Sequence, residues 1–499
     1  MFPCWSLLLI LQPTLAGVVD PTSLLEDFEV RISSLERRLR AVEQPVWHIS
    51  GVEGGWDVCA EGPCKCRVET RSLSCWSMGL SDLPPTQLVP KNILKLDLSS
   101  NQLMAVSKDT FNGLDQLSYL DMNDNAIEHL PISLFFPLRN VTHLRLSQNI
   151  LRELDRNQFI RMRNLEILDL SSNKLRALHG AMFSGNSLLV LLDLSTNRLT
   201  TLPSAGFRGL ASLEELLLSR NQLSVLPTDS FVGLTSLRRL SLEENRLEEL
   251  KPGLFLGLGK LTELNLRNNR LQVVPSNVLS PMEKLQLLEL TSNGIAHISS
   301  TAFRGLSRLR ELELGHNRLR KFARGVFQPC SGLERLVLHG NVFQTLEAGE
   351  FSGLVNLTSL FLHSNHLRLL HPACFRDVPK LRKLQLEDNH LSHLPKGVFD
   401  RFSELSQLRL SGNPWHCDCA SSYLAGWLRK KYQQQQLRDN NTGAWDFGAG
   451  AVCRGPGNLG GKLLVKLSYR ELCDNEWASM KGLAPRLPLE LVEDYMDEV

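Results

Sequence analysis

Eight of the eleven cysteines stand in two groups of four, and such groups either pair as disulfides or bind zinc. The first group is Cys59, Cys64, Cys66 and Cys75, and the second is Cys417, Cys419, Cys453 and Cys473. The long stretch between the groups holds only Cys330 and Cys374. Two even-numbered groups at the ends of a cysteine-poor region favour disulfides in an oxidising compartment, with zinc as the competing interpretation.

The N-terminus supports that compartment. Residues 5–15 are mostly apolar, and Ala16 and Gly17 form a small-residue cleavage site, which predicts a signal peptide over residues 1–17. A buried first helix is the alternative. No other apolar run is long enough to cross a bilayer, so we expect no membrane span. The formal net charge of +2 argues against a nucleic-acid binder driven by bulk charge. The mature chain is expected in the extracellular space or matrix.

Catalytic motifs are missing from the sequence. It contains no nucleophile elbow, no His-Glu-x-x-His and no phosphate-binding loop, so we expect no enzyme and no cofactor. Three sequons predict N-glycans, at Asn140, Asn356 and Asn440. Tyr495 lies among acidic residues in a pattern that resembles tyrosine-sulfation sites, whereas a disordered acidic tail is the plainer interpretation.

A sequence repeat occupies the chain between the two cysteine groups. An asparagine recurs at every 24th position from Asn101 to Asn413, with leucines in phase such as Leu96, Leu98 and Leu103. Ten residues after the asparagine stands phenylalanine, in twelve of the thirteen complete repeats; Leu279 is the exception. This is the leucine-rich-repeat pattern. It predicts an α/β solenoid with a curved parallel sheet on the concave face, in which each asparagine amide bonds to backbone groups of its own and the next turn.

The ends of the array resemble disulfide caps of extracellular leucine-rich-repeat proteins. By that resemblance Cys59 pairs with Cys66 and Cys64 with Cys75, within a cap over residues 59–90. The repeats follow over residues 91–412. The segment from Asn413 to Cys419 opens a matching cap over residues 413–474, with Tyr423, Leu424 and Trp427 on its helix and residues 433–448 as a loop. The implied pairs there are Cys417–Cys453 and Cys419–Cys473, and residues 475–499 form an acidic tail.

Among such families, the long phenylalanine-containing repeats and the C-terminal cap look most like the regulatory subunit of carboxypeptidase N and its relatives. That subunit is a non-catalytic carrier. The resemblance implies a carrier or stabilising role for another extracellular protein.

Residues 22–44 have a different period. Apolar residues spaced three and four apart predict three short heptads of a parallel coiled coil, with a trimer favoured over a dimer. These residues are Leu25, Phe28, Ile32, Leu35, Leu39 and Val42. Residues 45–58 would be the linker. The alternative is a helix folded onto the N-terminal cap. A trimer favours an oligomeric matrix or pattern-recognition protein that binds a repetitive ligand by avidity.

Concave positions suggest where a protein ligand binds. Four residues before each asparagine the column is largely acidic, including Glu289 and Glu313, and then becomes apolar at Val337 and Phe361. We expect these residues, with His339 and His363, to form an exposed binding patch. Random drift on a solvated face, or cover from the C-terminal cap, are the alternatives.

Two pairs of histidines recur at the repeat interval. His339 with His363, and His366 with His390, would stack about 5 Å apart, but two histidines without a carboxylate make an incomplete metal site, so we expect none.

Residues at core positions of the repeat lead to three further predictions. Asn186 occupies a slot that is otherwise apolar, so we expect a local distortion there. Cys330 fills the same slot in another repeat, and Cys374 lies two repeats further on, beyond the reach of a disulfide. Both are predicted to be free thiols.

Overall fold

The computed structural model describes residue 56 and residues 63–81, 89–436 and 450–473. The predicted signal peptide and coiled coil, the linker apart from residue 56, Cys59, Asn440 and the acidic tail lie outside the described residues.

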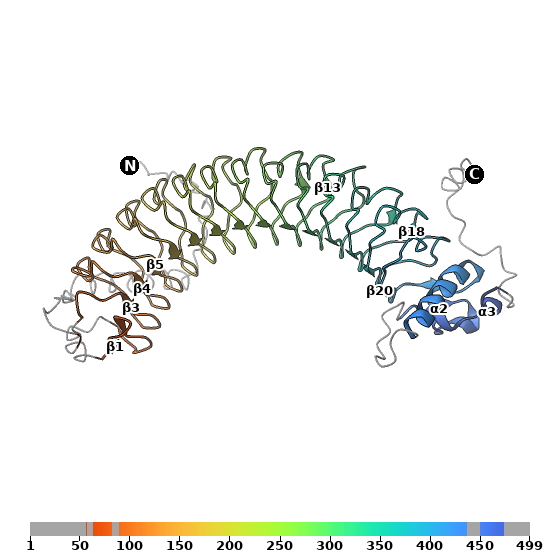
Figure 1. Cartoon of the computed structure of the whole chain (residues 1–499), viewed down its shortest axis with the longest axis horizontal. Helices are drawn as coiled ribbons and strands as arrows, with labels where there is room; N and C mark the ends of the chain where they lie inside the picture. Colours follow the sequence, from red (N-terminus) through yellow and green to blue (C-terminus); the bar gives the residue numbers. More distant parts are fainter. Residues whose placement is uncertain (1–55, 57–62, 82–88, 437–449, 474–499) are drawn as a thin grey trace, which may run out of the picture.

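The described chain forms an arc in which one long sheet lines the inner, concave side (Figure 1). The sheet has 16 strands, of which β1 and β2 pair antiparallel and the others follow in parallel. Neighbouring strands of the array pair in a register of one full repeat, as the sequence predicts; Leu96 pairs with Leu120, and Leu168 with Leu192. The strands are β1 (Lys65–Arg67), β2 (Ser72–Ser74), β3 (Lys95–Asp97), β4 (Tyr119–Asp121), β5 (His143–Arg145), β6 (Ile167–Asp169), β7 (Leu191–Asp193), β8 (Glu215–Leu217), β9 (Arg239–Ser241), β10 (Glu263–Asn265), β12 (Leu287–Glu289), β14 (Glu311–Glu313), β15 (Arg335–Val337), β17 (Ser359–Phe361), β19 (Lys383–Gln385) and β20 (Gln407–Arg409).

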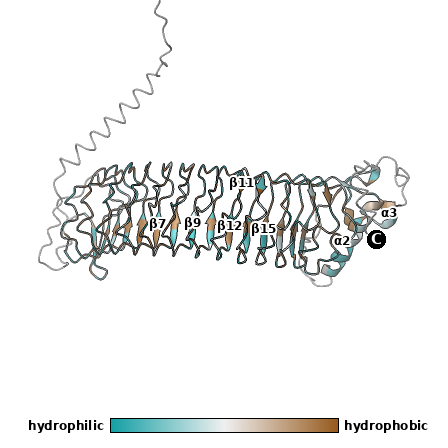
Figure 2. Cartoon of the chain, turned by 90° about the horizontal axis from the view of Figure 1, so that it is seen from above, coloured by the Kyte–Doolittle hydropathy of each residue, from teal (hydrophilic) through white to brown (hydrophobic). Residues whose placement is uncertain are grey.

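Smaller elements lie beside this sheet. Two pairs of short strands follow the main strands on one flank of the rod, where β11 is seen in Figure 2. These pairs are β11 (Val273–Val274) with β13 (His297–Ile298), and β16 (Thr345–Leu346) with β18 (Leu369–Leu370). The C-terminal cap contains β21 (Trp415–His416), η2 (Cys419–Ser421), α2 (Ser422–Gln436), β22 (Cys453–Gly455), η3 (Gly457–Leu459), η4 (Leu464–Lys466) and α3 (Tyr469–Cys473).

Leucines and phenylalanines fill the space behind the sheet. The middle residue of every three-residue strand from β3 to β20 is a leucine with no exposed surface, because side chains alternate between the two faces of a strand. Behind them the phenylalanine rings stack from turn to turn, as Phe111 does on Phe135 with ring centres 6.4 Å apart. Each turn therefore buries its apolar side chains only by packing against its neighbours.

The recurring asparagines, which we call the asparagine ladder, make hydrogen bonds between the turns. The side-chain Nδ2 of Asn149 donates to the backbone oxygens of Leu146 and Ser147 in its own turn, at 3.1 and 3.2 Å, and to that of Met122 at 2.9 Å. Its Oδ1 accepts from the backbone N–H of Ile127 at 3.1 Å. Met122 and Ile127 belong to the preceding turn, so the expectation of bonds to the next turn is wrong in direction.

Asn186 does not distort the solenoid. The strands on either side of its repeat pair in the regular register. Its Nδ2 donates to the backbone oxygens of Phe159 and Met162, at 3.0 and 2.8 Å, while its Oδ1 is buried without a hydrogen-bond partner. The amide is accommodated because two backbone carbonyls of the preceding turn accept hydrogen bonds from its Nδ2.

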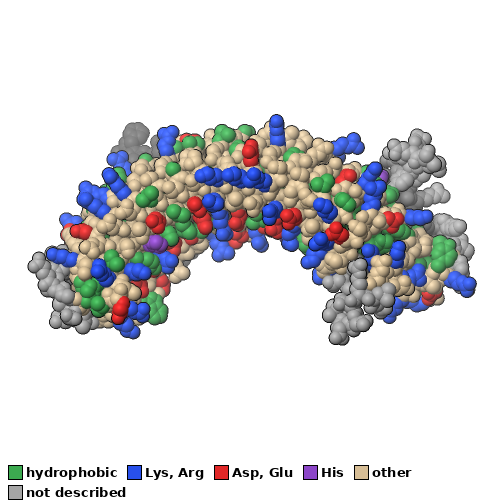
Figure 3. All heavy atoms as spheres, viewed as in Figure 1, with side chains coloured by type: hydrophobic (Ala, Val, Ile, Leu, Met, Phe, Trp, Pro, Cys, Tyr) green, Lys and Arg blue, Asp and Glu red, His purple; other side chains and the backbone are tan. Residues whose placement is uncertain are grey.

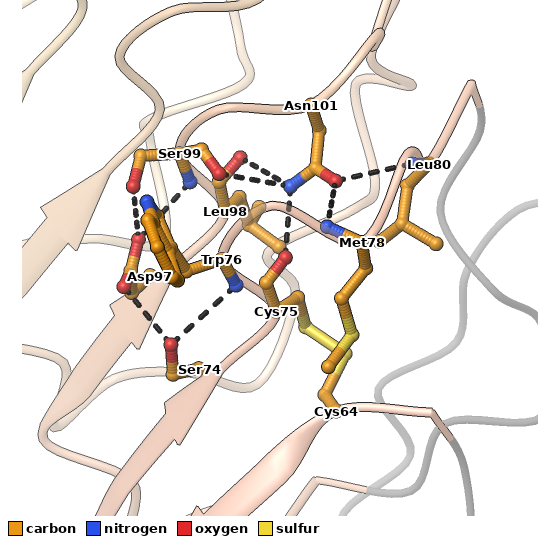
Figure 4. Close-up of a disulfide and its surroundings, with 10 residues drawn as sticks. All are labelled: Cys64, Ser74, Cys75, Trp76, Met78, Leu80, Asp97, Leu98, Ser99 and Asn101. Atoms are coloured by element: carbon orange, nitrogen blue, oxygen red, sulfur yellow. Dashed lines mark hydrogen bonds between the residues drawn. A yellow bond between two sulfur atoms is a disulfide. The ribbon is translucent and has the colours of Figure 1, made fainter.

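The N-terminal cap joins the array through the same ladder (Figure 4). Cys64 and Cys75 form a disulfide, and Asn101 donates from Nδ2 to the backbone oxygen of Cys75 at 2.8 Å. Its Oδ1 accepts from the backbone N–H groups of Met78 and Leu80, both at 3.0 Å. The first asparagine therefore binds the cap as later asparagines bind the turn before them.

The C-terminal cap closes the other end of the core. Trp415 is 1% exposed, and its Nε1 donates to the backbone oxygen of Leu410 at 3.0 Å. On α2, the Tyr423 hydroxyl accepts from the backbone N–H of Phe399 at 3.1 Å, and the Trp427 ring lies 5.2 Å from the Phe399 ring. Helix α2 extends to Gln436, so the loop expected from residue 433 does not begin there.

Candidate binding site on the concave face

The candidate site lies on the concave ends of β12, β14, β15 and β17. The parallel register places Glu289, Glu313, Val337 and Phe361 side by side in one row, in that order, with Gln385 next. The sheet thus brings together these four predicted residues from segments that are each one repeat apart. Figure 3 shows acidic and basic side chains intermixed along this concave edge.

Arg335 organises the acidic part of the row. Its Nε lies 2.7 Å from an oxygen of Glu311 and 3.0 Å from an oxygen of Glu313. Burial raises the pKa of Glu313 to about 7, although the bond and charge of Arg335 oppose that shift. The Glu313 side chain is only 14% exposed. An arginine held by two glutamates is a fixed, directional group for a partner to meet.

The apolar part of the row differs from the prediction. Val337 is only 2% exposed although it lies in the concave row, so it is not part of an exposed patch. It lies in register between Glu313 and Phe361, and the larger neighbouring side chains leave it little contact with solvent. Phe361 is partly exposed, and the guanidinium carbon of Arg335 lies 4.5 Å from its ring centre. The surface available to a partner is therefore an arginine–aromatic pair rather than two apolar side chains.

Three histidines lie at the edge of this pair. The rings of His339 and His363 stack with centres 4.6 Å apart and planes 4° apart, close to the expected separation. His316 meets His339 edge-on at 4.7 Å. Glycines make the room: a Cβ on Gly315 would lie 2.7 Å from Cε1 of His339, and one on Gly340 would lie 2.5 Å from Nδ1 of His316.

This setting keeps the stacked imidazoles neutral. Burial, then the charge of neighbouring His363, lowers the pKa of His339 to about 4, and burial likewise lowers the pKa of His363. The Nδ1 atoms of both rings are buried without a hydrogen-bond partner. Within the described residues, no group of three or more His, Cys, Asp or Glu side chains is arranged to hold a metal ion. The second pair, His366 and His390, stacks at 5.5 Å.

Some exposed apolar residues were not predicted from the sequence. Ile167 and Leu191 pair in register on β6 and β7 and are both partly exposed, and Leu188 and Val190, just before Leu191 in the chain, are 49% and 38% exposed. The signal was present in the run from Leu188 to Leu192, because its residues 188, 190 and 191 occupy positions that are mostly polar in other turns.

Comparisons with known proteins agree with this architecture. The family model described as Leucine rich repeat matches in overlapping segments that run from residue 71–127 to residue 356–414. The chain belongs to the leucine-rich-repeat family. No family of enzymes was matched, and no curated protein sequence matches the chain.

Several solved structures are similar. TLR13, in a complex with ssRNA13, has a TM-score of 0.66 and 28% identity over 76% of this chain and 54% of its own. A leucine-rich-repeat protein of Leptospira interrogans has a TM-score of 0.59 and 28% identity, covering 74% of this chain and 94% of its own. Toll of Drosophila, in a complex with Spatzle, shares the fold at a TM-score of 0.60 and 22% identity, with 76% of this chain and 54% of its own covered. The chain therefore spans about half the length of the TLR13 and Toll chains.

The remaining predicted groups of this leucine-rich-repeat chain lie at its ends, in its core and on one flank. The disulfides Cys417–Cys453 and Cys419–Cys473 have the pairing that the resemblance implies, and Cys66 is disulfide-bonded. Cys330 and Cys374 are buried free thiols, as predicted. No helix in the described part of the chain has the length and apolar character needed to cross a membrane.

Both described sequon asparagines occupy the same place in their turns. Nδ2 of Asn140 donates to the backbone oxygen of Asp115 at 2.8 Å, and Nδ2 of Asn356 donates to that of Ser331 at 2.9 Å. Asn356 also lines a hollow of about 620 Å³, together with Gly332 and Lys380. Both lie on the flank that precedes the strands, so a glycan at either position would leave the concave row uncovered.

Proposed function

We propose that this chain is a secreted, non-catalytic scaffold that binds an extracellular protein on its concave face, centred on Arg335 and Phe361. The observation that supports this proposal most is the contact between Arg335 and Phe361. A partly exposed aromatic ring lies under a guanidinium that two glutamates hold in place. Arginine and large aromatic side chains dominate the binding energy of protein interfaces, and ordering the arginine beforehand lowers the entropy lost on binding.

The charge around the pair indicates the partner's chemistry. Carboxylates recur along the same concave row, at Asp97, Asp121, Asp169, Asp193, Glu289 and Glu313. A partner with a basic segment and an apolar anchor would match this surface. Members of the same fold hold macromolecules, as TLR13 does ssRNA13 and Toll does Spatzle, which supports a binding role.

Crosslinking capture from secretion medium tests the concave site. We expect Phe361→Ser to weaken capture of the partner at least tenfold, while Leu217→Ser leaves it unchanged. Leu217 is the matched control, since it is a partly exposed apolar residue in the same row, six turns earlier. Unchanged capture by both variants would show that the site does not include Phe361. An equal loss of capture in both variants would indicate a general effect on the sheet.

The finer role rests on the resemblance to the regulatory subunit of carboxypeptidase N, which supports a carrier or stabiliser of another secreted protein. A carrier should co-purify with its partner in fixed stoichiometry and lengthen the partner's half-life in medium. A partner that is equally stable without this chain would contradict the carrier role.

The heptads of residues 22–44 support a second candidate, an oligomeric matrix or pattern-recognition protein. Light scattering at micromolar concentration should then give a trimer mass, and deletion of residues 18–46 should give a monomer. A monomer mass for both proteins would exclude this candidate and leave the carrier role intact.

A further inference from the structure

The flank that follows the strands carries a row of cations. Directly after the ladder asparagine, five of seven consecutive turns place a lysine or arginine, and we call these residues the basic row. They are Lys174, Arg198, Arg246, Arg270 and Arg318. The other two turns have Gln222 and Gly294 at this position, so no acidic residue interrupts the row.

The backbone fixes the row in space. The N–H of Arg198 donates to the oxygen of Leu175 in the preceding turn at 2.8 Å, and the N–H groups of Arg246 and Arg270 make equivalent bonds at 2.9 and 2.8 Å. Successive turns follow one another at about 5 Å, so neighbouring members of the row are about 5 or 10 Å apart and the row extends over roughly 30 Å. It lies between the main strands and β11, on the flank seen in Figure 2.

Charge in the row is largely uncompensated. The four arginines are exposed and Lys174 is partly exposed. Among the described residues, the carboxylate that reaches the row within 4.0 Å is Glu248, beside Arg270. On the opposite flank, Arg238 pairs with Glu214 at 3.3 Å and Arg382 with Glu404 at 2.8 Å, whereas Arg308 and Arg310 are exposed without an ion pair among the described residues. A chain with a net charge of only +2 therefore concentrates free positive charge along one line.

We propose that the basic row binds a sulfated polysaccharide, a function separate from protein binding on the concave face. An extended polyanion lying along the rod would meet a cation at most turns and release counterions from its own charged groups. The predicted glycans at Asn140 and Asn356 stand on the opposite flank and would leave the row open.

A single-stranded nucleic acid is the other extended polyanion to weigh. Its binding sites add aromatic side chains on which bases stack. Between Lys174 and Arg318 the row position has Gln222 and Gly294 besides its cations, and the position two residues further on has Arg176, Thr200, Ser224, Glu248, Gln272, Ala296 and Arg320. This surface offers charge and hydrogen-bond donors without a stacking platform, which favours the polysaccharide.

Heparin binding by the full-length protein tests the proposal, because the two flanks provide matched charge reversals. Arg246→Glu with Arg270→Glu changes exposed residues on adjacent turns of the basic row. Lys260→Glu with Lys284→Glu changes exposed residues on adjacent turns of the opposite flank and alters the net charge equally. We expect the first pair to weaken heparin binding at least tenfold at 0.15 M salt and the second pair less than threefold.

Two further measurements separate the ligand classes. Wild-type affinity should fall steeply with salt, and desulfated heparin should not compete. Equal loss from both double variants would overturn the assignment to the row, as would competition by desulfated heparin. Tighter binding of a single-stranded RNA of similar charge would overturn the polysaccharide in favour of a nucleic acid. Unchanged thermal unfolding of both variants establishes that each remains folded.

Discussion

The guanidinium carbon of Arg335 lies 4.5 Å from the centre of the Phe361 ring, although the two residues belong to different turns of the chain. The stacking of successive turns brings them together, and Glu311 and Glu313 fix the arginine from the other side. The same side chain therefore covers the aromatic ring and opposes the burial-induced rise in the pKa of Glu313.

Replacing Arg335 should change the titration of Glu313. Arg335→Met removes the hydrogen bond and the positive charge that lower this pKa, so we expect it to rise above its present value of about 7. Carboxyl NMR of glutamate-labelled protein measures it, with Glu313→Gln assigning the signal. Arg239→Met is the control, since Arg239 pairs with Glu263 at 3.6 Å and lies four turns before Arg335. A Glu313 pKa that stays unchanged in Arg335→Met would contradict this role of the arginine.

His339 should make stability depend on mildly acidic pH. Its folded-state pKa of about 4 lies below the value of 6.5 for an unperturbed histidine, so the unfolded chain binds the proton more readily. The stability that the neutral ring contributes is present above pH 6.5 and is lost as pH falls toward 4. In this window Glu313 acts with the opposite sign, because its folded-state pKa is raised from 4.5 to about 7 and its contribution is lost as pH rises.

A difference measurement isolates the histidine. His339→Phe keeps an aromatic ring in the stack and removes the proton, so the melting temperature of the variant should fall less than that of the wild type, by a few degrees, between pH 6.5 and 4.5. If the melting temperatures of the two proteins changed by the same amount across this pH window, protonation of His339 would not contribute to the pH dependence of stability.

Two buried asparagines should differ sharply on replacement. Asn245→Ala leaves the buried N–H of Leu223 without its acceptor and removes one of the two amide bonds to the oxygen of Leu218, which we expect to cost about 3 kcal/mol. Asn186→Leu should cost less than about 1 kcal/mol, because the oxygens of Phe159 and Met162 also accept backbone N–H bonds from Met162 and Leu165. Urea unfolding of both variants provides the comparison. A larger loss for Asn186→Leu would reverse this ranking.

The two free thiols should be inert in the folded protein. Cys330 and Cys374 are 0% and 1% exposed, and burial raises the pKa of Cys330 to about 12 and that of Cys374 further. Because the thiolate is the reactive form, we expect neither cysteine to react with iodoacetamide at pH 8 until denaturant is added. Peptide mapping by mass spectrometry identifies the alkylated positions. Rapid labelling of Cys330 without denaturant would show that the core opens at that turn.

Periodicity made most of the fold predictable. A fixed repeat interval determines which side chains become neighbours, so the sheet, the phenylalanine stack and the spacing of His339 and His363 all follow from counting. The exposure of a concave side chain does not. Val337 is buried because of the size and orientation of Glu313, Arg335 and Phe361 around it, and no single column of the repeat contains that information.

The direction of the asparagine hydrogen bonds between turns could not be predicted from the sequence either. The recurrence of asparagine shows that an amide bonds between turns but not to which neighbour. Asn186 predicted a disturbance because a polar residue stands in an otherwise apolar slot. Its hydrogen-bond acceptors are backbone carbonyls of the preceding turn, and the sequence gives no signal of where those atoms lie.

The backward direction of the asparagine bonds has a consequence for biosynthesis. The Nδ2 of Asn149 finds its inter-turn acceptor on Met122, a residue that the ribosome adds 27 steps earlier. Each new turn thus meets a template that is already made, starting from the cap that Asn101 binds through Cys75. The solenoid can grow in the order of translation, and no turn has to wait for a distant C-terminal segment before its own amide is satisfied.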